Sequence, residues 1–238
     1  MHKIQRNEPP NGLNEKNIEF NQKDNHTSEE IKNEWNAFTK SVLKKKTLEN
    51  LKEMFKNCCA YCEGKYVVTS SSQIEHFKPK SLYPNLMFDY TNMNLSCELC
   101  NKAKLNKFDE KLINPTVDEP YEHIQFKAYM IVPKDERGKT TIDMFKLNSN
   151  ERVNIKKTKY IPIYNRLEII KEEVDNIKLG KEKVNEWFIK LLTQTVEEME
   201  ETFEDGFEYT SMYRHNFKDI AQEMKLYLNN YYKSKNAR

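Results

Sequence analysis

Four of the five cysteines form two Cys-x-x-Cys pairs, Cys59/Cys62 and Cys97/Cys100. Two thiolates at this spacing can reach one metal ion from a tight turn, and two such pairs fill the four positions of a structural zinc site. We therefore predict that these side chains bind one structural Zn²⁺, with buried free thiols or disulfides as the alternatives. The fifth cysteine, Cys58, is expected to be a small buried residue, or else to exchange with Cys59 as a ligand.

The segment between the two pairs is long for a simple zinc ribbon, which usually has about 15–20 residues there. Here it runs over residues 63–96. The segment and the residues just after it carry five polar side chains able to do chemistry: Glu75, His76, Asn92, Asn101 and Lys104. We take these five as the candidate site.

The order of these residues resembles the motif of the HNH nucleases. That motif has a cysteine pair, an acid-His pair on a strand, an Asn on the returning segment, and Cys-x-x-Cys-Asn-x-x-Lys at the start of a helix. Asn92 stands nine positions before Asn101, as the corresponding residues do there. The resemblance implies a ββα-metal nuclease core stapled by zinc. In most members the acid is Asp, whereas here it is Glu75, whose longer side chain changes its reach.

Phosphodiester hydrolysis explains why such residue types are needed. The reaction requires an activated water and a cation that neutralises charge on the phosphate. His76 is the candidate general base because imidazole titrates near neutral pH. Glu75 and Asn101 are oxygen donors suited to Mg²⁺ or Mn²⁺. Asn92 is expected to fix the direction of the His76 ring, and Lys104, one helical turn beyond Asn101, to meet a phosphate.

The acid-His pair has a geometric difficulty, because adjacent residues on a strand point to opposite faces. Glu75 and His76 can serve one centre only if the strand twists, bulges or ends there. If both are structural, the chain is a zinc-stabilised nucleic-acid-binding or adaptor module without catalysis. A third alternative is the same nuclease acting on RNA.

The composition is that of a polar protein that can still bury a core. Charged residues make up 32% of the 238 residues, and the net charge is only +2, so any attraction to nucleic acid must come from local patches. No apolar run approaches a membrane span, and no leader pattern opens the chain. We therefore expect a cytoplasmic protein without membrane contact, a compartment that suits reduced, metal-binding cysteines.

The chain before the cysteines is expected to be an extended arm over residues 1–27, followed by two helices. The arm is rich in Asn, Lys and Glu and has few features of regular structure. Apolar residues then recur at helical spacing over 28–42 and again over 48–55. The run of three lysines at 44–46 is expected to be a solvated loop or face, with DNA contact as the alternative.

The rest of the chain divides into a motif region and a helical region. Strands over 65–69 and 73–77 are expected to pair as the hairpin of the motif. The other expected elements are strands over 124–132 and 140–147, a loop over 81–91 at the rim of the site, and a helix over 97–107. From residue 151, three apolar stripes at helical spacing, interrupted by Gly180 and Gly206, indicate three helices. Packing in a core is the default interpretation of these stripes. The more specific hypothesis is that they form a docking surface for a partner.

The predicted fold class is therefore α+β, with a zinc-stapled ββα core embedded in a mainly helical chain. We divide it into an N-terminal arm with helices (1–57), the nuclease core with its following strands (58–150), and a C-terminal helical region (151–238).

A narrower resemblance is carried by several short blocks. They are Met-x-x-Ile-x-Arg at 1–6, Cys-Ala-Tyr-Cys-Glu at 59–63, Ile-Glu-His-Phe-x-Pro-Lys at 74–80, Asn-Pro-x-x-Asp-x-Pro-x-x-His at 114–123 and Thr-Ile-x-x-x-x-Leu-Asn at 141–148. Together they resemble the PtuB group of HNH proteins, the nuclease subunits of Septu-type and some retron anti-phage systems. The resemblance implies DNA as substrate and an ABC-type ATPase, PtuA, as partner. Retron members add a reverse transcriptase–DNA complex as a further candidate partner. His123 belongs to one block, and by its chemistry alone we expect it to be structural.

Overall fold

The computed structural model describes residues 1–65 and 72–236, so most of the strand expected over 65–69 lies outside the described residues. The chain forms two compact units. The first, which we call the core unit, comprises Met1–Gln125 and Val132–Leu147. The second, the helical unit, comprises Phe126–Ile131 and Asn148–Arg238. The predicted arm and its helices thus share one unit with the motif.

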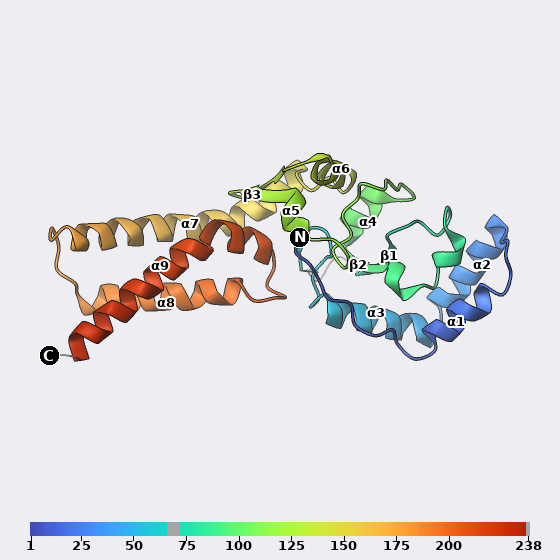
Figure 1. Ribbon diagram of the computed structural model, residues 1–238, viewed down its shortest axis with the longest axis horizontal. Helices are drawn as coiled ribbons and strands as arrows, with labels where there is room; N and C mark the ends of the chain where they lie inside the picture. The colour runs from blue at the N-terminus through green and yellow to red at the C-terminus, as the bar shows by residue number, and fades with distance from the viewer. Residues whose placement is uncertain (66–71, 237–238) are drawn as a thin grey trace. The chain divides into compact units, whose positions relative to one another are not determined.

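The motif folds into two antiparallel strands followed by a helix: β1 (Gln73–His76), β2 (Met93–Ser96) and α4 (Glu98–Lys104) (Figure 1). In the register of the sheet, Glu75 lies opposite Asn94 and His76 lies opposite Met93. Between the strands the chain makes two short 3-10 turns, η1 (Pro84–Leu86) and η2 (Tyr90–Asn92), where a loop was expected. The ββα arrangement implied by the HNH resemblance is therefore present.

Three helices precede the motif: α1 (Leu13–Phe20), α2 (Ser28–Thr39) and α3 (Val42–Met54). The expectation of an arm with little regular structure was wrong for α1. Leu13 and Phe20, which are seven positions apart and so share one helix face, are both buried. Thr27 starts α2 with a complete capping box, in which its hydroxyl accepts from Glu30 N and the Glu30 carboxylate accepts from Thr27 N.

The lysine run lies inside α3 rather than in a loop. Ser41 caps this helix by accepting a hydrogen bond from Lys44 N at 3.1 Å, so the helix begins before the lysines. The arm also fastens β2. Arg6 donates to the carbonyls of Tyr90 and Met93 at 2.7 and 2.9 Å and to Asn94 Oδ1 at 3.1 Å. An N-terminal residue thereby holds the return strand of the motif.

After the motif come α5 (Pro120–His123), β3 (Ile124–Lys127), β4 (Met130–Pro133) and α6 (Glu136–Met144). The strand expected over 124–132 is a two-stranded hairpin, because the chain turns at Ala128, which has a φ of 52°. The strand expected over 140–147 was wrong, since most of it lies in α6. Asp135 caps that helix by accepting a hydrogen bond from Gly138 N at 2.8 Å. An Asp at this position is a signal for the start of a helix, and it was overlooked because apolar and polar residues alternate in this segment as in a strand.

The helical unit contains the three expected helices, α7 (Asn150–Lys178), α8 (Glu186–Thr202) and α9 (Thr210–Asn236) (Figure 1). Their apolar stripes are buried at Leu167, Ile170 and Val174 of α7 and at Phe188 and Leu192 of α8. The hairpin tip belongs here as well, because Asn216 of α9 binds both the N–H and the carbonyl of Ala128.

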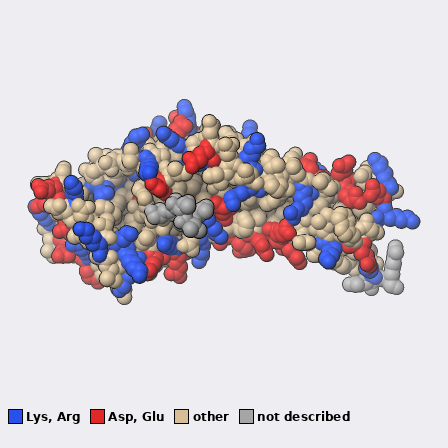
Figure 2. Space-filling model, turned by 180° about the vertical axis from the view of Figure 1, so that it is seen from behind, with Lys and Arg blue, Asp and Glu red and all other residues tan. Residues whose placement is uncertain are grey.

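Within residues 1–65 and 72–236, none of the helices combines the length and apolarity that crossing a membrane would require. On the face drawn in Figure 2, Lys and Arg side chains are intermingled with Asp and Glu and do not gather into a single field. The two signs of charge are thus mixed on that face, as the small net charge would suggest. Any attraction of an individual site for a charged ligand must come from the residues of that site.

Candidate functional site

The four predicted zinc ligands converge. Cys59 and Cys62 lie in the turn before β1, Cys97 caps α4 and Cys100 lies in its first turn, and their Sγ atoms all lie within 4.8 Å of one another. Cys62 Sγ and Cys97 Sγ are 3.8 Å apart. Two sulfurs of a tetrahedral site with Zn–S bonds of about 2.3 Å are expected roughly 3.8 Å apart. The donor set and its spacing therefore fit a zinc ion.

The geometry bears on two of the alternatives left open for the cysteines, the disulfides and the exchange of Cys58 with Cys59. All five cysteines lie in the described part of the chain, and none of them forms a disulfide. The sulfur of Cys58 is not a member of the cluster, although the residue is buried beside it. The pKa of Cys59 lies well below its ordinary value even though burial raises it, because the other three cysteines donate hydrogen bonds to its sulfur. Of the neighbouring pair Cys58 and Cys59, it is thus Cys59 whose sulfur belongs to the cluster.

His76 stands at the end of β1 with its ring fixed by a backbone carbonyl. His76 Nε2 lies 2.8 Å from the carbonyl oxygen of Met87. A carbonyl can only accept, so Nε2 carries the proton and Nδ1 keeps its lone pair in the neutral ring. Among the described residues, Nδ1 has no hydrogen-bond partner. This is the tautomer that a base acting through Nδ1 requires.

The surroundings of His76 keep its ring neutral. The side chain is buried, and its ring packs in a T-shaped arrangement with the ring of Trp35 of α2 at a centroid distance of 4.8 Å. Burial, and secondarily the positive charges of Lys80 and Lys104, lower the pKa of His76 to about 3. The imidazole is therefore unprotonated throughout the physiological pH range.

Asn92 supports His76 indirectly, through hydrogen bonds to the backbone. Its Nδ2 donates to the carbonyls of Lys78 and Leu86 at 2.9 and 3.1 Å, and its Oδ1 accepts from Lys78 N at 2.8 Å. These bonds tie together the two ends of the segment between Lys78 and Leu86. Because Leu86 precedes Met87, Asn92 holds the backbone that in turn holds the His76 ring, without contacting the ring itself.

Glu75 lies on the opposite face of β1 from His76, as strand alternation requires. Its Oε1 is 2.6 Å from Lys104 Nζ, and its Oε2 accepts from Tyr61 OH. Glu75 and Lys104 side chains are each 1% exposed, and burial raises the pKa of Glu75 against the lowering effect of Lys104. Lys104 also donates to the carbonyl of His76 at 2.6 Å. Both members of this buried ion pair are therefore occupied internally.

Asn101 projects from α4 toward β1. Its Nδ2 donates to Oε1 of Gln73, which leaves Asn101 Oδ1 without a hydrogen-bond partner among the described residues. Gln73 was not predicted as a site residue. The available signal was its place two positions before Glu75, which puts both on one face of the strand.

A cleft of about 460 Å³ opens beside β1. Of the five predicted site residues it is lined by Glu75, His76 and Asn101, whereas Asn92 and Lys104 do not line it. Its other wall comes from the N-terminal helices, through Trp35 and Thr39 of α2 and Lys44 of α3. Lys80 lies within it with Nζ 4.9 Å from the Trp35 ring centroid. The cleft therefore joins the motif to a segment outside it.

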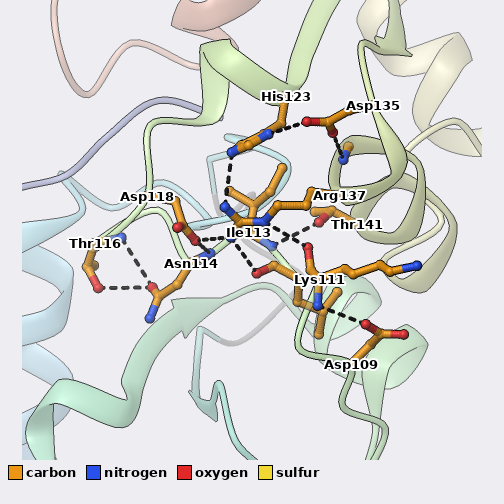
Figure 3. A network of polar contacts seen from close by, with 12 residues as sticks. Asp109, Lys111, Ile113, Asn114, Thr116, Asp118, His123, Asp135, Arg137 and Thr141 are labelled. Carbon is orange, nitrogen blue, oxygen red and sulfur yellow. Dashed lines mark hydrogen bonds and ion pairs between the residues drawn. The ribbon is translucent and has the colours of Figure 1, made fainter.

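His123 lies in a separate polar network, drawn in Figure 3. Its Nδ1 lies 2.6 Å from Asp135 Oδ2, and its Nε2 lies 3.1 Å from Arg137 NH1, which must donate. Arg137 also pairs with Asp118 at 2.7 Å. Gly138 permits this packing, because a Cβ there would lie 2.1 Å from the His123 carbonyl oxygen. Both ring nitrogens are thus occupied, as expected for a structural histidine.

Comparison with known proteins agrees with this geometry. Residues 59–107 match the family model described as HNH endonuclease. The chain is 42% identical over 106 residues to a protein named Septu protein PtuB from Bacillus thuringiensis, covering 43% of this chain and 41% of that protein. It is 31% identical over 150 residues to Septu protein PtuB from Bacillus mycoides (strain KBAB4), covering 48% of this chain and 51% of that protein.

The chain thus spans about half the length, or less, of the curated relatives it matches. The matched family segment includes all four clustered cysteines and all five predicted site residues. From the ββα geometry, the cysteine cluster and the family match together, residues 59–107 are an HNH endonuclease-family domain, and the chain is similar over part of its length to proteins named Septu protein PtuB.

Proposed function

We propose that the core unit is a metal-dependent endonuclease that hydrolyses DNA phosphodiester bonds, with His76 as the general base. The observation that carries the proposal is the bond from His76 Nε2 to Met87 O, which leaves Nδ1 as the basic nitrogen of a ring that lines a cleft. A positioned base of this kind takes a proton from the attacking water. Asn92 supports it by holding the segment that ends at Met87.

Glu75 and Asn101 are the proposed ligands of a catalytic Mg²⁺ or Mn²⁺. Such a cation supplies neutralisation of charge on the phosphate and the leaving oxygen. Asn101 fits this role, because its Oδ1 is unengaged among the described residues beside the cleft. Glu75 Oε1 is buried, and its contact with Lys104 Nζ lacks hydrogen-bond geometry. Lys104 therefore serves in this structure as the cation that balances Glu75.

The metal of the cysteine cluster is proposed to be a structural Zn²⁺, distinct from the catalytic ion. Thiolates favour zinc, whereas carboxylate and amide oxygens favour Mg²⁺ or Mn²⁺. The cluster supports this assignment because its four sulfurs leave no position for a substrate or water on a tetrahedral ion.

One cleavage assay tests both metal assignments. The zinc-loaded protein is incubated with plasmid DNA, and in a parallel reaction with RNA, after brief EDTA treatment and then with added Mg²⁺ or Mn²⁺. We expect cleavage of DNA to stop in EDTA and return with the added ion, while elemental analysis still finds zinc. Failure of Mg²⁺ and Mn²⁺ to restore cleavage to zinc-retaining protein contradicts the two-site proposal, and preferential cleavage of RNA contradicts the choice of DNA.

A second candidate function is favoured by the internal pairing of Glu75 with Lys104. If that pair is purely structural, the chain is a zinc-stabilised nucleic-acid-binding or adaptor module. Such a module binds DNA in the assay above but cuts neither nucleic acid under any metal condition.

We further propose that the chain acts in the cytoplasm as part of an anti-phage defence complex, in line with its similarity to proteins named Septu protein PtuB. We propose a PtuA-like ABC-type ATPase as its partner, contacted through the helical unit. That unit exposes large apolar side chains, including Trp187 at 71%, Ile169 at 67% and Leu226 at 61%. Replacing these three by Asp should abolish co-purification with the ATPase. The same change at Val117 of the core unit, which is 67% exposed, is the matched control and should leave the complex intact.

A further inference from the structure

The cleft has a second wall that the HNH segment does not supply. Trp35, Thr39 and Lys44 line it from α2 and α3, and all three lie outside the matched residues 59–107. The segment of α2 and α3 supplies neither strand of the ββα motif and none of the four clustered cysteines. Its side chains in the cleft can therefore contact a ligand bound there.

This wall carries positive charge that the protein does not balance. In the described part of the chain, neither Lys44 nor Lys80 makes an ion pair with a carboxylate, whereas Glu75 is paired with Lys104. Other lysines of the core unit are paired, such as Lys102 with Glu98. In a chain of net charge +2, two unpaired cations in one cleft form a local anion-attracting site.

The lysine run of α3 is divided by the geometry of the helix. Lys44 is half-buried and lines the cleft, whereas Lys45 and Lys46 are exposed and do not line it. Successive residues of a helix point about 100° apart, so three consecutive lysines cannot share one face. The run is therefore not a uniform basic patch, and Lys45 provides a natural comparison for Lys44.

Trp35 links this wall to the proposed base. Lys80 Nζ lies over the Trp35 ring, 4.9 Å from its centroid. The Trp35 and His76 rings also form a T-shaped pair with their centroids 4.8 Å apart. An aromatic face holds an ammonium group by cation–π attraction without neutralising its charge. Lys80 is thus held beside His76 with its charge directed to the ligand rather than to a protein carboxylate.

We propose that Lys44 and Lys80 bind phosphates of the nucleic-acid strand next to the phosphate attacked at His76, and that Trp35 is the positioning residue for Lys80. This inference rests on the proposed nuclease function and adds the N-terminal helices to its substrate site. Lysine binds phosphate as a compact charge, so the contacts hold the strand without reading its sequence.

The test measures affinity for a fluorescently labelled DNA duplex over a range of salt concentrations. The full-length zinc-loaded protein carries His76→Ala so that no strand is cut. Lys44→Ala and Lys80→Ala are each compared with Lys45→Ala, which removes the same charge from the same helix as Lys44. We expect the first two to weaken binding. We also expect them to make the fall of log affinity with log salt shallower, by about one unit of slope. Lys45→Ala should change neither quantity appreciably.

Equal losses for Lys44→Ala and Lys45→Ala, or an unchanged salt slope for Lys44→Ala and Lys80→Ala, would overturn the inference. Either result leaves the nuclease proposal standing, because that proposal is decided by cleavage with the native His76. The role of Trp35 is tested by a double-mutant cycle, in which Trp35→Ala should weaken binding less when Lys80 is already Ala. Fully additive losses would contradict its positioning role.

Discussion

The cysteine cluster and the cleft both include residues of α4, Cys100 in the first and Asn101 in the second, yet they differ in how complete they are. The four sulfurs already have the spacing of a tetrahedral metal site. In the cleft, His76 is oriented, but the Glu75 carboxylate is held by Lys104 and Tyr61 on the other face of β1. The comparison shows that close spacing supplies the ligands of the first site two at a time, so that only two short turns have to meet. The second depends on contacts between distant segments.

The largest effect expected from this comparison is on the cysteine cluster. Replacing Cys97 with Ser should release zinc and unfold the core unit, because a structural zinc site contributes on the order of 10 kcal/mol to folding. Thermal denaturation and elemental analysis check this. Cys58→Ala is the matched control, since its sulfur lies outside the cluster, and it should retain zinc at a cost of about 1 kcal/mol. Zinc retained by folded Cys97→Ser protein would remove the cluster from its structural role.

The buried ion pair behind the cleft should give the next largest effect. Lys104→Met leaves Glu75 charged and buried without its partner, so we expect a loss of about 3–5 kcal/mol in the free energy of unfolding. Adding Glu75→Gln should restore much of that loss, because the amide needs no counter-charge. Chemical denaturation of the two single variants and the double variant measures the coupling. Independent, additive losses would show that the pair is not a unit.

A smaller effect is expected in the dependence of stability on pH. The pKa of His76 is about 3 in the folded protein and ordinarily 6.5, so between these values the unfolded chain binds a proton that the folded protein excludes. Stability should therefore fall as pH is lowered from 6.5 toward 3 and be unaffected by His76 above that window. Glu75, whose pKa is raised, opposes this trend.

The contribution of His76 is isolated by comparing the wild type with His76→Gln. Loss of zinc in acid affects both proteins, so the difference between their stability curves reports the histidine. The wild type should lose more stability than the variant between pH 6.5 and 5. Parallel curves would mean that the ring is not held neutral.

The parts that could be predicted from the sequence are those fixed by local spacing. The cysteine pairs and the three C-terminal helices follow from intervals of a few residues, and the ββα order follows from the resemblance to the HNH motif. The strand β2 was not expected, because the hairpin partner of residues 73–77 was placed at 65–69, whereas β1 pairs with Met93–Ser96. The Met87 carbonyl on His76 could not be predicted, because every residue carries a carbonyl and only the fold selects one. The place of Trp35 was also hidden, since it lies 41 positions before His76 and its helical spacing indicated only core packing.

Two errors have a common physical cause. The residues of α6 alternate enough to suggest a strand, and α1 is too polar to suggest a buried face. In both cases tertiary contacts decide the outcome. Thr141 accepts from Ile113 N at 3.0 Å, and Leu13 and Phe20 are buried in the core unit. Local propensity is a weak guide where a short segment is held by packing.

The role of His76 is the centre of this account, and its replacement by Ala tests that role most directly. Cleavage rate, melting temperature and DNA affinity are measured on one zinc-loaded preparation with Mg²⁺ or Mn²⁺ present. His123→Ala is the control, because it removes a hydrogen-bonded histidine from the network around Arg137, away from the cleft. We predict that His76→Ala lowers the cleavage rate about 10²–10⁴-fold while the protein stays folded and still binds DNA. A folded His76→Ala protein that cuts DNA at near the wild-type rate would contradict the account.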